Sequence, residues 1–240
     1  MTDFSKTKIH CSSLSVLFTE PQSKADKEAG ELSKTAKAHL VEVYIREVWG
    51  RYEDITSKQI QKGNLAEEEI ITLLGFIDNK PYVKNEERKE NEWIIGTADI
   101  VDEIIIDAKS SWSAKSFIPK ILEPLDKDYF YQMQGYLWLW DIKIGRVSYA
   151  LVNCPESILQ NERRKLLFNM NVATEESPEY LEAVKELEKN HIFDDVPLEQ
   201  RIFNIEIERD ENIIRQIPAK VEKAREYLSF IQSKHLKSKI

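Results

Sequence analysis

The apolar residues of this chain recur with spacings that alternate between those of helices and those of strands. Residues three to four positions apart share one face of a helix, as Leu40, Tyr44 and Val48 do after a capping Ser33. Short apolar runs bounded by polar residues, such as RVSYALVN, are typical of strands. We expect helices over residues 33–49, 57–77, 126–140, 156–168 and 178–189, and strands over residues 93–101, 103–109, 146–153 and 201–208.

A long C-terminal helix completes the pattern, with apolar residues at positions 214, 217, 221, 224, 228 and 231. The elements then follow one another as α, α, β, β, α, β, α, α, β, α. This order predicts an α/β (α+β mixed) fold, in which a central mixed β-sheet is flanked by helices. Neither an internal repeat nor a Pro/Gly/Ser-rich linker interrupts the chain, so we expect residues 1–240 to form a single domain.

Composition allows a folded protein with a sizeable core, because 42% of the 240 residues are hydrophobic. No apolar run approaches the roughly eighteen residues of a membrane span, and the start, MTDFSKTKIHCSS, lacks the apolar centre of a signal peptide. We therefore expect a cytoplasmic protein without a membrane partner. Cys11 and Cys154 are too few for a disulfide framework or a four-cysteine metal site, and we interpret both as packing residues.

The net charge of −8 argues against a nucleic-acid partner, because nucleic-acid-binding domains are usually basic. The charge is unevenly distributed, however. Residues 172–211 hold thirteen Asp and Glu against four Lys and Arg, whereas residues 212–240 hold two against seven. The basic C-terminal segment could follow a phosphate backbone, or it could be the solvated face of a helix.

Acidic and basic residues interrupt the stretch GTADIVDEIIIDAKSSW, which otherwise resembles the inside of a sheet. Residues two apart on a strand share a face, so Asp107 and Lys109 point the same way. If the preceding strand pairs with this one across a turn near Asp102, Asp99 lies beside Asp107, and two carboxylates that close repel unless a cation joins them. Mg²⁺ or Mn²⁺ prefers such oxygen ligands. The alternative is that Asp99 caps a turn and Asp107 pairs with Lys109 on a wet edge strand.

Two helices add polar residues to this picture. Glu67 precedes Ile70, Ile71 and Leu74 by three, four and seven positions, which predicts a place in the buried stripe, above the sheet face that carries the acids. The alternative is a boundary glutamate that reaches into water. In DYFYQMQGYLWLW, Gln132 and Tyr136 lie one turn apart and form a polar ledge, unless Tyr136 is core and Gln132 merely tolerated.

Taken in order, these pieces resemble a known family. Gly63 with Glu67, Gly96 with Asp99, Asp107 with Lys109, and Gln132 with Tyr136 are similar to the four motifs of the PD-(D/E)XK nuclease superfamily, and most similar to its phage lambda exonuclease, YqaJ and RecB-like branch. The resemblance implies a restriction-endonuclease-like core over about residues 57–153, with a helical and strand extension over residues 172–240. The second acid is Asp107 where many relatives have glutamate, and the four cysteines of CRISPR-associated relatives are absent.

The resemblance also implies roles for individual residues. Glu67, Asp99, Asp107 and the carbonyl of Ala108 would bind one or two Mg²⁺ (or Mn²⁺) ions, Lys109 would orient or activate the attacking water, and Gln132 would position the lysine or the phosphate. Ser12 and Ser13 resemble a serine-containing element that touches a DNA phosphate, although a serine pair is common in any loop. Trp112, Lys115 and Lys120 follow the strand with Asp107 and are candidate DNA contacts, the tryptophan by stacking and the lysines by phosphate pairing, although a packed tryptophan is the commoner outcome. Tyr136 is a further candidate for binding the substrate.

The function implied is a Mg²⁺-dependent deoxyribonuclease, a 5′ to 3′ double-strand exonuclease of phage-type recombination in a bacterial or phage-infected bacterial host. The implied partners are DNA, a single-strand annealing protein and further copies of the chain in a trimeric ring. The alternatives are a structure- or sequence-specific endonuclease of the same superfamily and a catalytically silent DNA-binding module. The presence of both Asp107 and Lys109 argues against the silent module.

Overall fold

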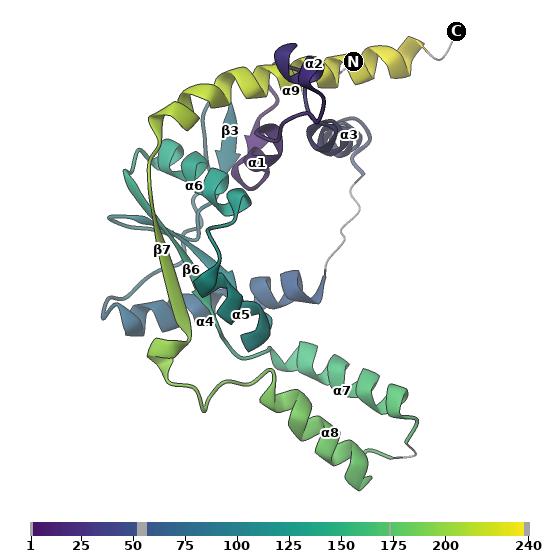
Figure 1. The fold of residues 1–240 in the computed structure, drawn as a ribbon, viewed down its shortest axis with the longest axis vertical. Coiled ribbons are helices and arrows are strands. Elements are labelled where there is room, and N and C mark those ends of the chain that lie inside the picture. The colour runs from purple at the N-terminus through teal and green to yellow at the C-terminus, as the bar shows by residue number, and fades with distance from the viewer. Residues whose placement is uncertain (1, 52–56, 173, 238–240) are drawn as a thin grey trace.

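A four-stranded mixed sheet carries the central part of the chain in this computed structural model, which describes residues 2–51, 57–172 and 174–237 (Figure 1). Its strands lie in the order β4 (Ile100–Val101), β5 (Ile105–Ser110), β6 (Ile144–Ala150) and β7 (Ile202–Glu208). β5 and β6 are parallel, and the outer strands run antiparallel to their neighbours. A parallel pair needs a crossover, which α5 (Ala114–Leu122) and α6 (Lys127–Trp140) provide.

A second, three-stranded sheet has the order β1 (Ile9–His10), β3 (Ile94–Gly96) and β2 (Lys89–Glu90). The expectation of one continuous strand over residues 93–101 is therefore wrong, because the chain leaves this sheet after β3 and joins the other at β4. Gly96 marks the break: a Cβ here would lie 2.7 Å from Cε1 of Tyr136 and 2.8 Å from Sγ of Cys11. The glycine thus lets α6 and the 3₁₀ turn η1 (Cys11–Ser13) approach the backbone where the two sheets separate.

Helices α4 (Lys58–Ile77) and α6 cover opposite faces of the four-stranded sheet. The apolar side chains of α4 pack on Ile106 and Ala108 of β5, whereas those of α6 pack on Ile105 of the same strand. Both helices begin where the sequence predicts, and each has a capping residue at its start. Ser57 accepts a hydrogen bond from the Ile60 amide at 3.3 Å, and Asp126 accepts one from the Asp128 amide at 3.0 Å.

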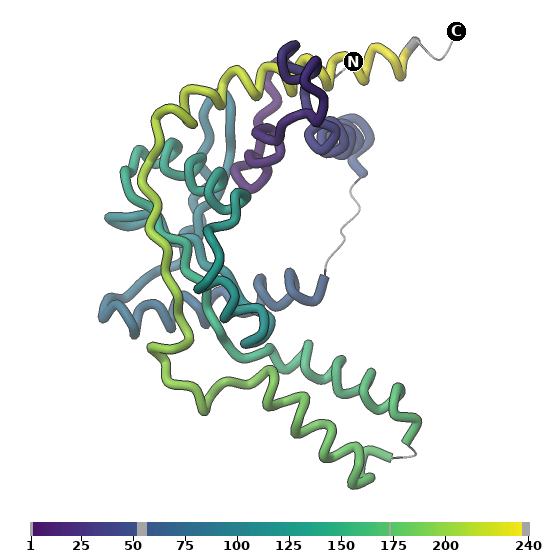
Figure 2. The backbone as a smooth tube through the Cα atoms, viewed as in Figure 1, coloured from purple at the N-terminus to yellow at the C-terminus, as the bar shows by residue number. Residues whose placement is uncertain are grey.

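The two ends of the chain pack together at one side of the molecule, where α3 (Lys34–Trp49) and α1 (Leu14–Leu17) contact the long helix α9 (Glu211–Lys237) (Figure 2). Arg225 of α9 donates to the carbonyl of Thr7 at 2.9 Å and to that of Glu92 at 2.6 Å. The stripe expected on α9 is confirmed: its members at positions 214, 217, 221, 224 and 228 are buried, and Ile231 is partly buried. The stripe expected on α3 is confirmed too, with Leu40 and Tyr44 buried and Val48 partly so.

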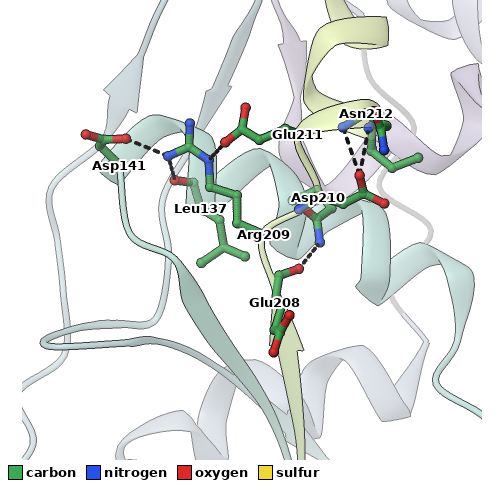
Figure 3. Close-up of polar contacts among 9 residues, drawn as sticks. Leu137, Asp141, Glu208, Arg209, Asp210, Glu211 and Asn212 are labelled. Atoms are coloured by element: carbon green, nitrogen blue, oxygen red, sulfur yellow. Dashed lines mark hydrogen bonds and ion pairs between the residues drawn. The ribbon is translucent and has the colours of Figure 1, made fainter.

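Polar contacts join α6 to the junction between β7 and α9, where Glu208, Arg209 and Asp210 lie (Figure 3). The Gln134 amide donates to the carbonyl of Glu208 at 2.8 Å and accepts from the amide of Asp210 at 2.7 Å. Nearby, Arg209 donates to Asp141 at 2.5 Å and pairs with Glu211 at 2.8 Å. These contacts fix the start of α9 against the helix that faces β5.

Helices α7 (Glu156–Met170) and α8 (Pro178–Lys189) form a hairpin that projects from the rest of the chain (Figure 1). Arg163 joins the two helices through Glu188, and Lys58 joins α4 to Glu162 of α7, both at 2.6 Å. Several elements were not expected from the sequence: β1, η1, α1, α2 (Lys24–Glu28), β2, α5 and the 3₁₀ turn η2 (Leu198–Gln200). None of the helices in the described part of the chain is long and apolar enough to cross a membrane.

Candidate active site

Strand β5 presents its two charged residues on the face that α6 covers. Ile106 and Ala108 point toward α4, so the alternation of a strand turns Asp107 and Lys109 the other way. Oδ2 of Asp107 lies 2.7 Å from Nζ of Lys109, and the aspartate is almost fully buried. The ion pair is therefore inside the protein and not on a wet edge strand.

Asp99 reaches the same strand from the residue that precedes β4. The register of β4 and β5 pairs Ile100 with Ile106, and its continuation sets Asp99 opposite Asp107. Oδ2 of Asp99 accepts a hydrogen bond from the Ala108 amide at 2.7 Å. The carboxylate thus replaces the backbone acceptor that β4 no longer supplies, which explains why an acidic side chain is held so close to a second one.

The two aspartates share an excess of negative charge. Burial and the neighbouring Asp107 raise the pKa of Asp99 from 3.8 to about 7, against the opposing effects of Lys109 and the Ala108 amide. Burial also raises the pKa of Asp107, and here too Lys109 opposes the rise. The pKa of Lys109 is itself raised: burial works against its charge, but Asp107 and Asp99 outweigh this. One lysine is thus firmly protonated beside two carboxyl groups that it compensates only in part.

Helix α6 supplies the expected polar ledge. Nε2 of Gln132 donates to Oδ1 of Asp107 at 3.2 Å and to the hydroxyl oxygen of Tyr136 at 2.9 Å. Both side chains are buried, and burial raises the pKa of Tyr136 far above its usual value, so the phenol stays neutral. The structure therefore brings together Asp99, Asp107, Lys109, Gln132 and Tyr136.

Glu67 approaches this group from the other side of the sheet. The expectation that its helix lies above the face with the acids is wrong, because α4 covers the opposite face. The buried stripe of α4 runs through Ala66, Ile70 and Leu74, and Glu67 lies at its margin with 23% of its side chain exposed. Its Oε2 pairs with Nζ of Lys84 at 2.9 Å. Glu67 nevertheless contributes to the raised pKa of both aspartates, so its charge acts on the same site.

The donor set fits a divalent cation. Three carboxylates and the carbonyl of Ala108 are the hard oxygen ligands that Mg²⁺ and Mn²⁺ take. Oδ2 of Asp107 is buried and accepts no well-directed hydrogen bond from the described residues, although Lys109 lies beside it. Within the described part of the chain, no three His, Cys, Asp or Glu side chains already surround a common point, because Glu67 is turned to Lys84 and Asp99 to an amide.

The remaining sequence candidates lie at different distances from this centre. Ser12 and Ser13, on η1, line a pocket of about 500 Å³ with His10, His39, Glu42, Val43 and Arg46. Cys11 of the same turn packs against α6 at Gly135, one residue before Tyr136. Trp112 follows β5 and packs edge-on against His191, with ring centroids 4.9 Å apart, while Lys115 is exposed in the first turn of α5.

Two residues near the site were not singled out by the sequence reasoning. Lys62 of α4 is completely buried, and its ammonium donates to the carbonyls of Ser111 at 2.8 Å and Val152 at 2.7 Å, just beyond β5 and β6. Tyr129 of α6 lies over Lys109. Tyr129 lies three residues before Gln132, and this spacing places both on the same helix face. Nothing in the local pattern distinguishes Lys62 from a surface lysine.

Comparison with solved structures supplies a relative with the same architecture. The chain aligns with a phage-related exonuclease from Haemophilus somnus 129PT at 31% sequence identity, with a TM-score of 0.75, over 96% of this chain and 97% of that one. The chain belongs to the family of phage-related exonucleases. The family lies in the lambda exonuclease and YqaJ-like branch of the PD-(D/E)XK nucleases, which the four motifs resemble.

More distant structures share the fold alone. An alkaline exonuclease, LHK-Exo from Laribacter hongkongensis, aligns at 13% identity with a TM-score of 0.61, over 97% of this chain and 95% of that one. The same enzyme in complex with dAMP aligns at 14% identity with a TM-score of 0.60, over 96% and 94% of the two chains. No protein-family model and no curated protein sequence matches the chain.

Proposed function

We propose that this chain is a Mg²⁺-dependent (or Mn²⁺-dependent) exodeoxyribonuclease that degrades linear duplex DNA from the 5′ end. The observation that carries the proposal is the buried group of Asp99, Asp107 and Lys109, with Gln132 fixed against it. Buried charges are costly unless a partner compensates them, so their concentration at one place is typical of a functional site. Membership of the phage-related exonucleases supports the same reaction.

The metal ligands proposed are Glu67, Asp99, Asp107 and the carbonyl of Ala108. Burial, and then repulsion between carboxylates, raises the pKa of Asp99 and Asp107, and a cation at this place would favour their charged forms. When bound, a divalent ion neutralises the charge that protects a phosphodiester and lowers the pKa of the attacking water. To bind there, Glu67 would have to leave Lys84 and turn toward the two aspartates, by a rotation of its partly exposed side chain.

The protein's own cation and amide have separate tasks in this proposal. Because the pKa of Lys109 is raised, the side chain is an ammonium donor near neutral pH and not a general base. It orients the attacking water and stabilises charge that develops on the phosphate. Gln132 holds Oδ1 of Asp107, and the Tyr136 hydroxyl in turn fixes the orientation of Gln132.

DNA contacts are proposed at two places outside the acidic group. The pocket next to η1 would take a DNA phosphate, with Ser12 and Ser13 as donors and Arg46 as the cation. Trp112 and Lys115 follow β5 directly and would contact the strand leaving the site, the tryptophan through the face that His191 does not cover.

The proposed biological setting is phage-type recombination with a single-strand annealing protein, and the proposed assembly is a trimeric ring. A chain with a net charge of −8 has little electrostatic attraction for DNA. Closed threefold symmetry would place several copies of its basic patches around one channel, and a strand that is enclosed stays bound without strong affinity.

The experiment compares linear duplex, labelled at one 5′ or one 3′ end, with a covalently closed circle of the same sequence. In Mg²⁺ we expect the linear duplex to be degraded, with early release of the 5′ label, and the circle to stay intact. EDTA should stop the reaction. Rapid cleavage of the closed circle would contradict the exonuclease proposal and favour an endonuclease of the same superfamily.

A further inference from the structure

An aromatic ring lies over the ammonium group of Lys109. Nζ is 4.8 Å from the centroid of the Tyr129 ring and 2.7 Å from Oδ2 of Asp107. The face of an aromatic ring carries the negative part of its quadrupole and attracts a cation at this distance. The lysine is therefore held on two sides, by a carboxylate and by a ring face.

The Tyr129 ring is supported from the sheet. Its centroid lies 6.0 Å from that of Tyr149, at an interplanar angle of 62°, which is an edge-to-face contact. Tyr149 is buried on β6 and is the residue paired with Lys109 in the register of β5 and β6. The ring that covers Lys109 thus rests on the neighbouring strand at the same level as the lysine.

Helix α6 contacts each of the two charged residues of β5 through a different side chain. Tyr129 and Gln132 are three residues apart and share a helix face, which is the face turned to β5. Gln132 donates to Asp107, and Tyr129 covers Lys109. Each member of the ion pair therefore has its own partner on one rigid helix.

We propose that Tyr129 is a positioning residue for Lys109. The Tyr129 ring holds the ammonium beside Asp107 and prevents the long, flexible lysine side chain from adopting other rotamers. An unrestrained lysine loses substantial rotamer entropy when it is fixed for a reaction. With the ring in place, Lys109 loses this rotamer entropy when the protein folds and not when substrate binds. The inference rests on the proposed nuclease function, in which Lys109 orients water and phosphate.

Three variants separate the ring from the rest of the side chain. Tyr129→Leu removes the aromatic face and keeps apolar bulk, whereas Tyr129→Phe keeps the face and removes only the hydroxyl. Tyr131→Leu is the matched control on the same helix, because that ring stacks on Phe18, with centroids 4.3 Å apart, and not on Lys109.

The first measurement needs no activity. Growth on lysine labelled with ¹³C at Cε marks every lysine without modifying its ammonium, and the Lys109 resonance is the one missing from Lys109→Arg. Groups over a ring face resonate upfield, so we expect an upfield Lys109 Cε–H signal in the wild type, in Tyr129→Phe and in Tyr131→Leu, and loss of the upfield shift in Tyr129→Leu. A wild-type Lys109 signal at the position of exposed lysines would overturn the proposal.

The second measurement is the steady-state rate on linear duplex in Mg²⁺. We expect kcat to fall about tenfold in Tyr129→Leu with KM unchanged, and to stay near the wild-type value in Tyr129→Phe and Tyr131→Leu. An unchanged kcat in Tyr129→Leu, or an equal loss in Tyr129→Phe, overturns the positioning role. A wild type with the upfield signal but without cleavage would instead refute the proposed function.

Discussion

Replacing Asp99 by asparagine should stabilise the metal-free protein at pH 8. Its carboxyl has a pKa raised from 3.8 to about 7 by burial and by Asp107, so the charged form is disfavoured in the folded state. Asparagine keeps an oxygen for the Ala108 amide and cannot ionise. Each pKa unit corresponds to about 1.4 kcal/mol, which sets an upper bound of about 4 kcal/mol. Because Asp107 shares the proton equilibrium, we expect about half of that bound, or a Tm higher by about 4–8 °C.

The pH dependence gives the sign of the effect. A raised carboxyl pKa means that the folded state binds more protons than the unfolded state between about pH 4 and pH 7, so the stability of the wild type falls as pH rises through this window. The fall should be smaller in Asp99→Asn. Mg²⁺ should raise the Tm of the wild type and have little effect on the variant, since ligands that bind only the folded state stabilise it.

Thermal unfolding in EDTA and in Mg²⁺, from pH 4 to pH 8, measures both effects. Asp102→Asn is the matched control, because Lys80 holds the pKa of that partly exposed carboxyl below its usual value, and loss of the carboxylate should not stabilise the protein. The reasoning is refuted if Asp99→Asn is no more stable than the wild type at pH 8, or if Mg²⁺ raises the Tm of both proteins equally.

Three further predictions concern the scaffold and the assembly. Lys62→Met should lower the free energy of unfolding by about 3 kcal/mol, because buried carbonyls lose their donor. Burial lowers the pKa of Lys62 to about 8, so the wild type should gain stability from pH 8 upward, and the variant should not. If urea unfolding gave Lys62→Met the same stability as the wild type, the structural role of Lys62 would be refuted. Gln134→Leu should lower the free energy of unfolding in urea by about 2 kcal/mol, and the exposed control Gln216→Leu should lower it less. Equal effects of the two substitutions would show that the hydrogen bonds of Gln134 do not stabilise the junction of β7 and α9. Light scattering should give three times the mass of the 28.1 kDa chain, and a monomer at all concentrations would exclude the ring.

The long elements could be predicted from the sequence because their signals are local. Ser33 caps its helix as the pattern indicates, the next two long helices begin where the sequence predicts, and the α9 stripe is buried where its spacing places it. The partition of residues 93–101 between two sheets could not be predicted. It depends on Cys11 and Tyr136, which are distant in sequence and close around Gly96 in space.

The candidate site was predictable where strand alternation decides it. The period of two sets Asp107 and Lys109 on one face, and a hairpin brings Asp99 opposite. Helix periodicity alone could not give the side of the sheet from which Glu67 approaches, because that depends on how α4 and α6 divide the two faces. The burial of Lys62 could not be predicted from the sequence either, since its partners are backbone carbonyls beyond the ends of two strands.

The most direct test of the account is the Mg²⁺-dependent release of labelled nucleotides from linear duplex by the wild type, by Lys109→Ala and by Asp107→Ala, with the Mg²⁺-induced rise in Tm followed on the same samples. We predict that the wild type cleaves and is stabilised by Mg²⁺. Lys109→Ala should keep the rise in Tm while its rate falls by orders of magnitude, because the lysine is not a ligand, and Asp107→Ala should lose both. Near-normal cleavage by Lys109→Ala, or an unchanged response to Mg²⁺ in Asp107→Ala, would contradict the assignment of this buried group as the active site.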